Sequence, residues 1–84
     1  MKSRTLVTSS VAEKMKESSS FHAFVISSIT RHLMGDWGEC YKEDAMTNDV
    51  DPLNAMSVYT YFDGSTIWIK SDYDIITVLF PSEY

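Results

Sequence analysis

Residues 57–69 read SVYTYFDGSTIWI. Two runs rich in β-branched and aromatic residues flank Asp63-Gly64, which is a strong signal for a two-residue β-hairpin turn. In the first run the even-numbered side chains from Val58 to Phe62 are expected on one face of a strand, and the odd-numbered ones from Ser57 to Tyr61 on the other. The second run, Ile67–Ile69, is the partner strand. This stretch therefore predicts an antiparallel hairpin.

The sequence on either side of the hairpin extends the sheet. Ser71–Asp74 is expected to form the next turn, and Ile75–Phe80 a last strand that Pro81 ends. Near the start of the chain, Leu6–Thr8 is either a short strand or an extended lead-in. The C-terminal half is thus predicted to be a three-stranded antiparallel meander. Whether a short N-terminal strand joins it as a fourth is not decided by the sequence.

Helical spacing dominates the first half of the chain. Ser10 and Glu13 have the spacing of a capping box, which predicts a short helix through Glu17. Ser18–Ser20 then caps a second helix that ends at Gly35, a residue suited to a left-handed C-cap. The apolar face of this second helix comprises Phe21, Phe24, Val25, Ile29 and Leu33.

A third helix is predicted over Glu39–Asn48, and Asp51 with Pro52 is suited to start one further turn. Helices followed by strands predict the α+β class, with the second helix packed on one face of the sheet. At 84 residues the chain has room for one small core, so residues 1–84 are expected to form a single domain.

Composition and charge narrow the functional classes. The single cysteine, Cys40, cannot form an internal disulfide, and no apolar segment approaches the length of a signal or a membrane span, so a cytoplasmic protein is expected. Residues 1–35 carry five basic and two acidic side chains, whereas residues 36–84 carry two basic and ten acidic ones. Such an acidic half favours a basic partner and opposes nucleic-acid binding; the alternative is that it only keeps the protein in solution.

Chemistry-bearing motifs are sparse. His22, His32 and Cys40 lack the close pairing of zinc ligands, and Gly35–Gly38 has an acid and an indole where a phosphate loop needs open backbone amides. No metal and no cofactor are therefore expected. Cys40 could act as a thiolate nucleophile with His32 as its base, but a lone cysteine is far more often a small apolar filler.

Trp37 stands between two glycines at the corner after the second helix. The structural interpretation makes it a lid on the core with its indole N–H bonded locally; the functional one makes it part of a binding face with Asp36 and Glu39. Tyr59, Tyr61 and Trp68 lie on adjacent strands and are predicted to share one aromatic sheet face, either covered by helices or bound to a protein. If that face is exposed, it would also favour a homodimer.

Three blocks carry a resemblance. RHLMGDWG at 31–38, IWI at 67–69 and TVLFPSEY at 77–84 resemble small plasmid-related proteins of bacterial mobile elements. The pattern of that family has an Asp-Arg-Ser stretch before the last strand, whereas here Asp72-Tyr73-Asp74 runs directly into Ile75 without an arginine. The resemblance implies a mobile-element setting, and it implies no activity and no catalytic residue.

These observations predict a non-enzymatic acidic protein that binds a basic surface of a host protein or protein–nucleic-acid complex. In a mobile element, such a protein could inhibit a defence system, as anti-CRISPR or anti-restriction proteins do, by occluding a nucleic-acid channel. The alternatives are an accessory adaptor that binds through the aromatic face, and a Cys–His enzyme. The predicted partner-binding residues are Asp36, Trp37, Glu39, Glu43, Asp44, Asp49, Asp51, Tyr59, Tyr61 and Trp68.

Overall fold

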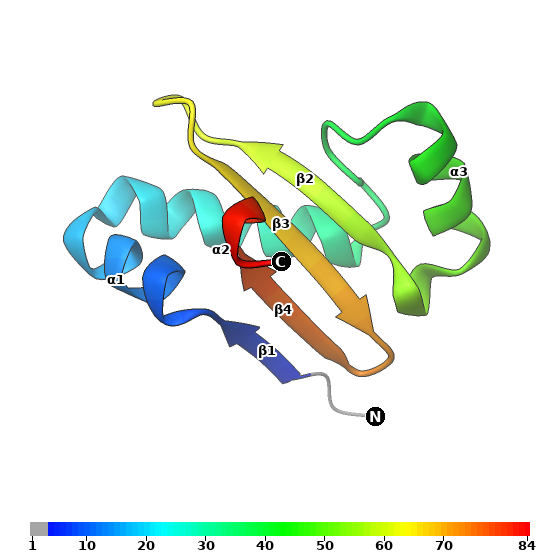
Figure 1. The fold of residues 1–84 in the computed structure, drawn as a ribbon, viewed down its shortest axis with the longest axis horizontal. Coiled ribbons are helices and arrows are strands. Elements are labelled where there is room, and N and C mark those ends of the chain that lie inside the picture. The colour runs from blue at the N-terminus through cyan, green and yellow to red at the C-terminus, as the bar shows by residue number, and fades with distance from the viewer. Residues whose placement is uncertain (1–3) are drawn as a thin grey trace.

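The computed structural model describes residues 4–84, and these form an α+β fold, as the sequence predicts. A four-stranded mixed sheet has the order β1-β4-β3-β2, with α2 behind it in Figure 1 and α3 beyond β2. In chain order, the elements are β1 (Arg4–Val7), α1 (Ser9–Glu17), α2 (Ser19–Leu33), α3 (Lys42–Val50), the 3-10 turn η1 (Pro52–Asn54), β2 (Met56–Thr60), β3 (Thr66–Asp72), β4 (Ile75–Leu79) and the 3-10 turn η2 (Pro81–Glu83).

The predicted meander is confirmed, since β2 pairs antiparallel with β3 and β3 with β4. The open question of an N-terminal strand is also resolved: β1 lies parallel to β4, with Leu6 opposite Thr77. This strand begins at Arg4, before the predicted Leu6. It ends at Val7, because Thr8 is already the N-cap of α1.

The two hairpin connections differ from the prediction. The predicted two-residue turn at Asp63-Gly64 is wrong, because the Tyr61 N–H donates to the Ser65 carbonyl at 2.8 Å and leaves a three-residue loop. Gly64 takes φ +94°, the left-handed position that such loops require. The two-residue turn instead joins β3 to β4 at Tyr73-Asp74, within the predicted 71–74 turn, and Tyr73 has φ +57°.

The helix ends show which caps the backbone uses. The Thr8 hydroxyl accepts the Val11 N–H at 3.3 Å, so Thr8 and not Ser10 is the N-cap of α1. Thr8 can do so because its own backbone is still extended from β1. Ser18 caps α2 as predicted, and Gly35 ends it at φ +81° in a Schellman motif, where Asp36 N–H donates to the Arg31 carbonyl.

The buried face of α2 comprises Phe21, Val25, Ser28 and His32. Phe21 and Val25 are fully buried in the core against Tyr59, Ile67, Ile69 and Val78 of the sheet. The predicted apolar face is wrong at its C-terminal end, because Leu33 is 60% exposed while His32 faces the sheet. At this end His32 can occupy an inward position because β2 and β3 present the hydroxyls of Ser57 and Ser71 to its ring nitrogens.

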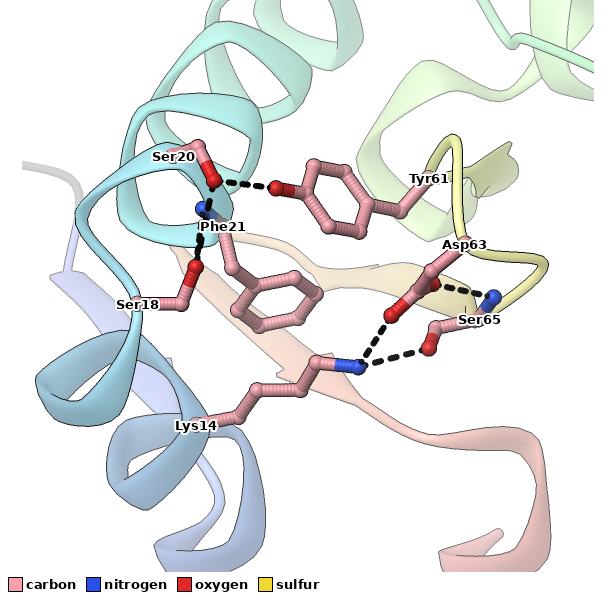
Figure 2. A network of polar contacts seen from close by, with 7 residues as sticks. All are labelled: Lys14, Ser18, Ser20, Phe21, Tyr61, Asp63 and Ser65. Carbon is pink, nitrogen blue, oxygen red and sulfur yellow. Dashed lines mark hydrogen bonds and ion pairs between the residues drawn. The ribbon is translucent and has the colours of Figure 1, made fainter.

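A polar cluster ties the helical hairpin to the loop between β2 and β3 (Figure 2). The Lys14 ammonium donates to Asp63 at 2.9 Å and to Ser65 at 2.7 Å while lying 4.8 Å from the centre of the Phe21 ring. On the other side of Phe21, the hydroxyls of Ser20 and Tyr61 are hydrogen-bonded. This cluster fixes one end of the sheet against α1 and α2 and leaves the other end to the Trp37 corner.

Candidate binding groove

A groove of about 600 Å³ opens between α3 and the outer face of the sheet, the face turned away from α2. Met56, Val58 and Trp68 form its apolar floor, and Asp44 and Tyr41 stand on the α3 side. Glu39 and Cys40, from the segment before α3, complete this side of the groove. The groove therefore combines apolar surface with carboxylates.

The groove exists because Asn48 holds α3 at the edge of the sheet. Its amide donates to the Met56 carbonyl at 2.7 Å, and its oxygen accepts the Met56 N–H at 3.2 Å. Asn48 is 6% exposed, so both bonds are shielded from water. Sequence analysis missed this residue. Asn48 is the buried position of an otherwise exposed, polar helix, and a single sequence carries no signal for such a position.

The segment before α3 is held by the backbone of β2. Val58 N–H donates to the Trp37 carbonyl at 3.1 Å, and Glu39 N–H donates to the Val58 carbonyl at 2.7 Å. Gly38 lies between them at φ +73°, and a Cβ on it would come 2.0 Å from the Val58 oxygen. A glycine is required here because backbone meets backbone.

Trp37 is a lid, as its structural interpretation predicts. Its side chain is 8% exposed, and its indole N–H donates to Asp49 of α3 at 2.8 Å. Its ring also meets the edge of His32, with 5.4 Å between ring centres. Trp37 thus supports α3 from beneath and offers little surface to a partner.

The predicted shared face of Tyr59, Tyr61 and Trp68 is wrong. Tyr59 and Tyr61 point to the α2 side, where they are 1% and 8% exposed. Trp68 lies opposite Val58 in the register, on the outer face of the sheet. Neighbouring residues of a strand lie on opposite faces of the sheet, so Val58 and Tyr59 face opposite ways, as do Trp68 and Ile67. Because Val58 pairs with Trp68 and Tyr59 with Ile67, the register places Trp68 on the face opposite to Tyr59.

Tyr59 and Tyr61 have structural partners instead. The Tyr59 hydroxyl donates to the Asp36 carbonyl at 2.5 Å, and the Arg31 guanidinium lies 4.8 Å from its ring centre. Burial raises the pKa of this phenol. Tyr61 packs edge-on against Phe21 at 5.3 Å. Trp68 alone among the three faces the groove, and its ring meets that of Tyr84 at 5.4 Å.

The acidic side chains do not form one patch. Glu39 and Asp44 line the groove, and Glu43 shares the exposed first turn of α3 with Asp44. Asp49 is bonded to Trp37, and Asp51 accepts a bond from Asn54 at 3.0 Å. Asp36 forms an ion pair with Arg31 at 2.7 Å, and hydrogen bonds from Arg31 and the Gly38 N–H lower the pKa of this carboxyl.

The predicted start of the third helix also needs correction. α3 begins at Lys42 rather than at Glu39, because residues 38 and 39 are engaged with β2. As a result, Glu39 stands on the segment that flanks the groove. Lys70, at the end of the groove near η1, donates to the carbonyls of Asn54 and Ser71 at 3.0 and 2.6 Å.

The Cys40–His32 alternative finds no support in the geometry. The two ring nitrogens of His32 lie 2.6 Å from the hydroxyls of Ser57 and Ser71, so both are engaged with serines. Burial lowers the pKa of His32 to about 4, with a further effect from Lys70. Burial and then Asp44 raise the pKa of the Cys40 thiol, which disfavours the thiolate.

Within residues 4–84 no group of three or more histidine, cysteine or acidic side chains is arranged to hold a metal ion. None of the helices in the same residues is long and apolar enough to cross a membrane. No protein-family model, curated protein or solved structure matches this chain. The groove and its residues are therefore the basis for a functional proposal.

Proposed function

We propose that this protein is a non-enzymatic binding protein whose groove between α3 and the outer sheet face holds a basic segment of a partner protein. The observation that carries the proposal is the meeting of Glu39, Asp44 and Trp68 around one groove. Two carboxylates of the acidic stretch and the half-buried Trp68, which are separate signals in the sequence, thus line one groove.

Charge favours a cationic occupant. Glu39 and Asp44 stand at the groove and Glu43 stands next to them, while the ammonium of Lys70 is turned to two backbone carbonyls. A lysine or arginine side chain entering the groove would gain charge-assisted hydrogen bonds from these carboxylates. The same carboxylates would repel the phosphates of a nucleic-acid backbone.

The floor favours a segment that also carries apolar side chains. Trp68, Val58 and Met56 offer a partly exposed apolar surface, and a tryptophan in such a position is a frequent centre of protein-binding energy. An arginine is favoured over a lysine, because its planar guanidinium can stack on the Trp68 indole while bonding a carboxylate.

Channels of nucleic-acid-handling enzymes present such arginine-bearing surfaces. In its more specific form, the proposal is that the protein inhibits a CRISPR or restriction effector by binding such a channel. This form rests on charge together with the resemblance to plasmid-related proteins. The adaptor hypothesis differs from it chiefly in salt dependence, since an interaction carried by Trp68 alone would persist at high salt.

The test is capture of partners from a bacterial lysate by the tagged protein at low and at high salt. The double variant Glu39→Lys with Asp44→Lys should lower recovery of a specific partner by about tenfold or more, since two attractions become repulsions. The matched control is Glu13→Lys with Glu17→Lys, which changes net charge equally on the exposed side of α1.

Trp68→Ala supplies the second arm. Loss of the partner in both groove variants, with retention in the α1 control, supports the groove. Equal loss in the control and the groove variant would mean that net charge alone matters, and this result would contradict the proposal. A salt-resistant partner that is lost only with Trp68→Ala would favour the adaptor.

A further inference from the structure

One edge of the sheet is open and the other is closed. β1 is the last strand on its side of the sheet, and among residues 4–84 nothing pairs with its outer edge (Figure 1). On the opposite side, the edge of β2 is covered by backbone bonds from the segment at Trp37–Glu39. An uncovered edge offers unpaired N–H and C=O groups to another strand.

β1 is a short edge strand that lacks two of the usual guards against pairing. It has neither a proline nor a bulge, and its residues RTLV are all exposed. Leu6 is 43% exposed and Val7 is 37% exposed, so apolar side chains flank the open backbone. Arg4 is its single charge. A strand with these properties favours pairing with a further strand.

The backbone directions along β1 follow from its bonds to β4. Arg4 N–H donates to the Asp74 carbonyl at 2.8 Å, and Thr8 N–H donates to the Val78 carbonyl at 3.1 Å. Because these groups alternate along a strand, Arg4, Leu6 and Thr8 face β4. Thr5 and Val7 therefore direct their N–H and C=O groups outward.

We propose that β1 pairs antiparallel with β1 of a second copy of this chain, so that two four-stranded sheets join into one. One register that keeps like faces together sets Leu6 opposite Leu6 of the other copy and Thr5 opposite Val7. Thr5 and Val7 are the residues with outward backbone groups, so this register gives four hydrogen bonds between the copies. The two Leu6 side chains meet on the outer face.

Charge at the ends of β1 supports the same register. It brings Arg4 of one copy opposite Thr8 of the other, and the Thr8 hydroxyl donates to Glu83 at 2.9 Å. Hydrogen bonds from the Phe80 N–H and from Thr8 lower the pKa of Glu83, so its carboxylate is charged at neutral pH. The two-fold axis therefore creates the Arg4–Glu83 attraction twice.

The interface is small, so the dimer is expected to be weak and concentration-dependent. Sedimentation equilibrium from about 10 µM to about 1 mM covers the range in which such a contact dissociates. Thr5→Pro should weaken dimerisation by about tenfold or more, because it removes an outward N–H and leaves the bonds to β4 intact. Leu6→Lys should do the same by placing two ammonium groups opposite each other.

The matched control is Ile26→Lys, which changes a similarly exposed apolar residue (48%) on α2, away from β1. It should dimerise as the wild type does. Hydrogen exchange adds a residue-specific readout, since the Thr5 and Val7 amides should become protected as protein concentration rises. A monomer at every concentration, or unchanged dimerisation in both Thr5→Pro and Leu6→Lys, would overturn the proposal.

Discussion

Trp37 and Trp68 place the same side chain in two opposite settings. Trp37 lies at the closed junction between α2, α3 and the sheet, 8% exposed and hydrogen-bonded to Asp49. Trp68 lies on the open outer face, half-buried, with Tyr84 as its aromatic neighbour. In the described residues every buried side-chain N or O atom has a hydrogen-bond partner, so the closed junction is fully satisfied. The first tryptophan is part of the closed junction, and the second is the aromatic residue of the proposed binding groove.

Replacing each tryptophan with alanine should distinguish these two settings by the loss in the free energy of unfolding. The loss for Trp37→Ala is the largest effect that we expect. Trp37→Ala should lower the free energy of unfolding by about 3–5 kcal/mol, because it empties a buried volume and leaves Asp49 without its donor. Trp68→Ala should cost under about 2 kcal/mol, since much of its surface is already in water. Guanidinium denaturation measures both; equal costs would remove the distinction.

Gly38→Ala tests how tightly the junction is built. The residue has φ +73°, and its new Cβ would lie 2.0 Å from the Val58 carbonyl, so the backbone pairing that carries Glu39 must open. We expect a loss of about 3 kcal/mol or more, from strain plus the clash. Gly64→Ala is the control, because it has φ +94° but nothing within 4 Å, and it should cost only about 1 kcal/mol. Thermal or chemical unfolding of the two variants checks this difference, and equal losses would mean that the close approach at Gly38 is unimportant.

The comparison also shows what the sequence could predict. Elements whose residues repeat with a clear period were predicted correctly, namely α2, with its Ser18 cap and Gly35 end, and the meander from Met56 to Leu79. Local chemistry decides such elements, because a cap or an alternating strand needs only its neighbours in sequence. The role of Trp37 as a lid followed from the two glycines beside it.

The candidate site was predicted only in part. Glu39, Asp44 and Trp68 were named as binding residues, but nothing local shows that they meet around one groove. Their meeting depends on Asn48, which joins α3 to Met56, and on the register that sets Trp68 beside Val58. The same register turns Tyr59 and Tyr61 into core residues. Long-range pairing therefore decided the site, and a single sequence carries no signal for it.

Acid should weaken the closed junction, and the expected loss of stability is smaller than that from Trp37→Ala or Gly38→Ala. His32 has a pKa of about 4 in the fold against an ordinary value of 6.5, because its ring is buried between Ser57 and Ser71. A lowered histidine pKa means that the unfolded chain binds a proton more readily than the folded one does. The stability is thus fully present above pH 6.5 and is lost as the pH falls toward 4.

Between pH 7 and pH 5 this linkage should remove about 2 kcal/mol from the free energy of unfolding, measured by denaturation at each pH. His32→Gln cannot gain the proton, so it should lose the slope over this interval. It should also be less stable at pH 7, because the substitution changes the buried contacts with Ser57 and Ser71. His22→Gln, which changes the exposed histidine of the same helix, should keep the slope of the wild type. A slope that survives His32→Gln would assign the acid sensitivity to other groups. A slope that vanishes would show that the serine pair holds a neutral imidazole in the fold, and that protonation of this ring is what couples the stability of the junction to pH.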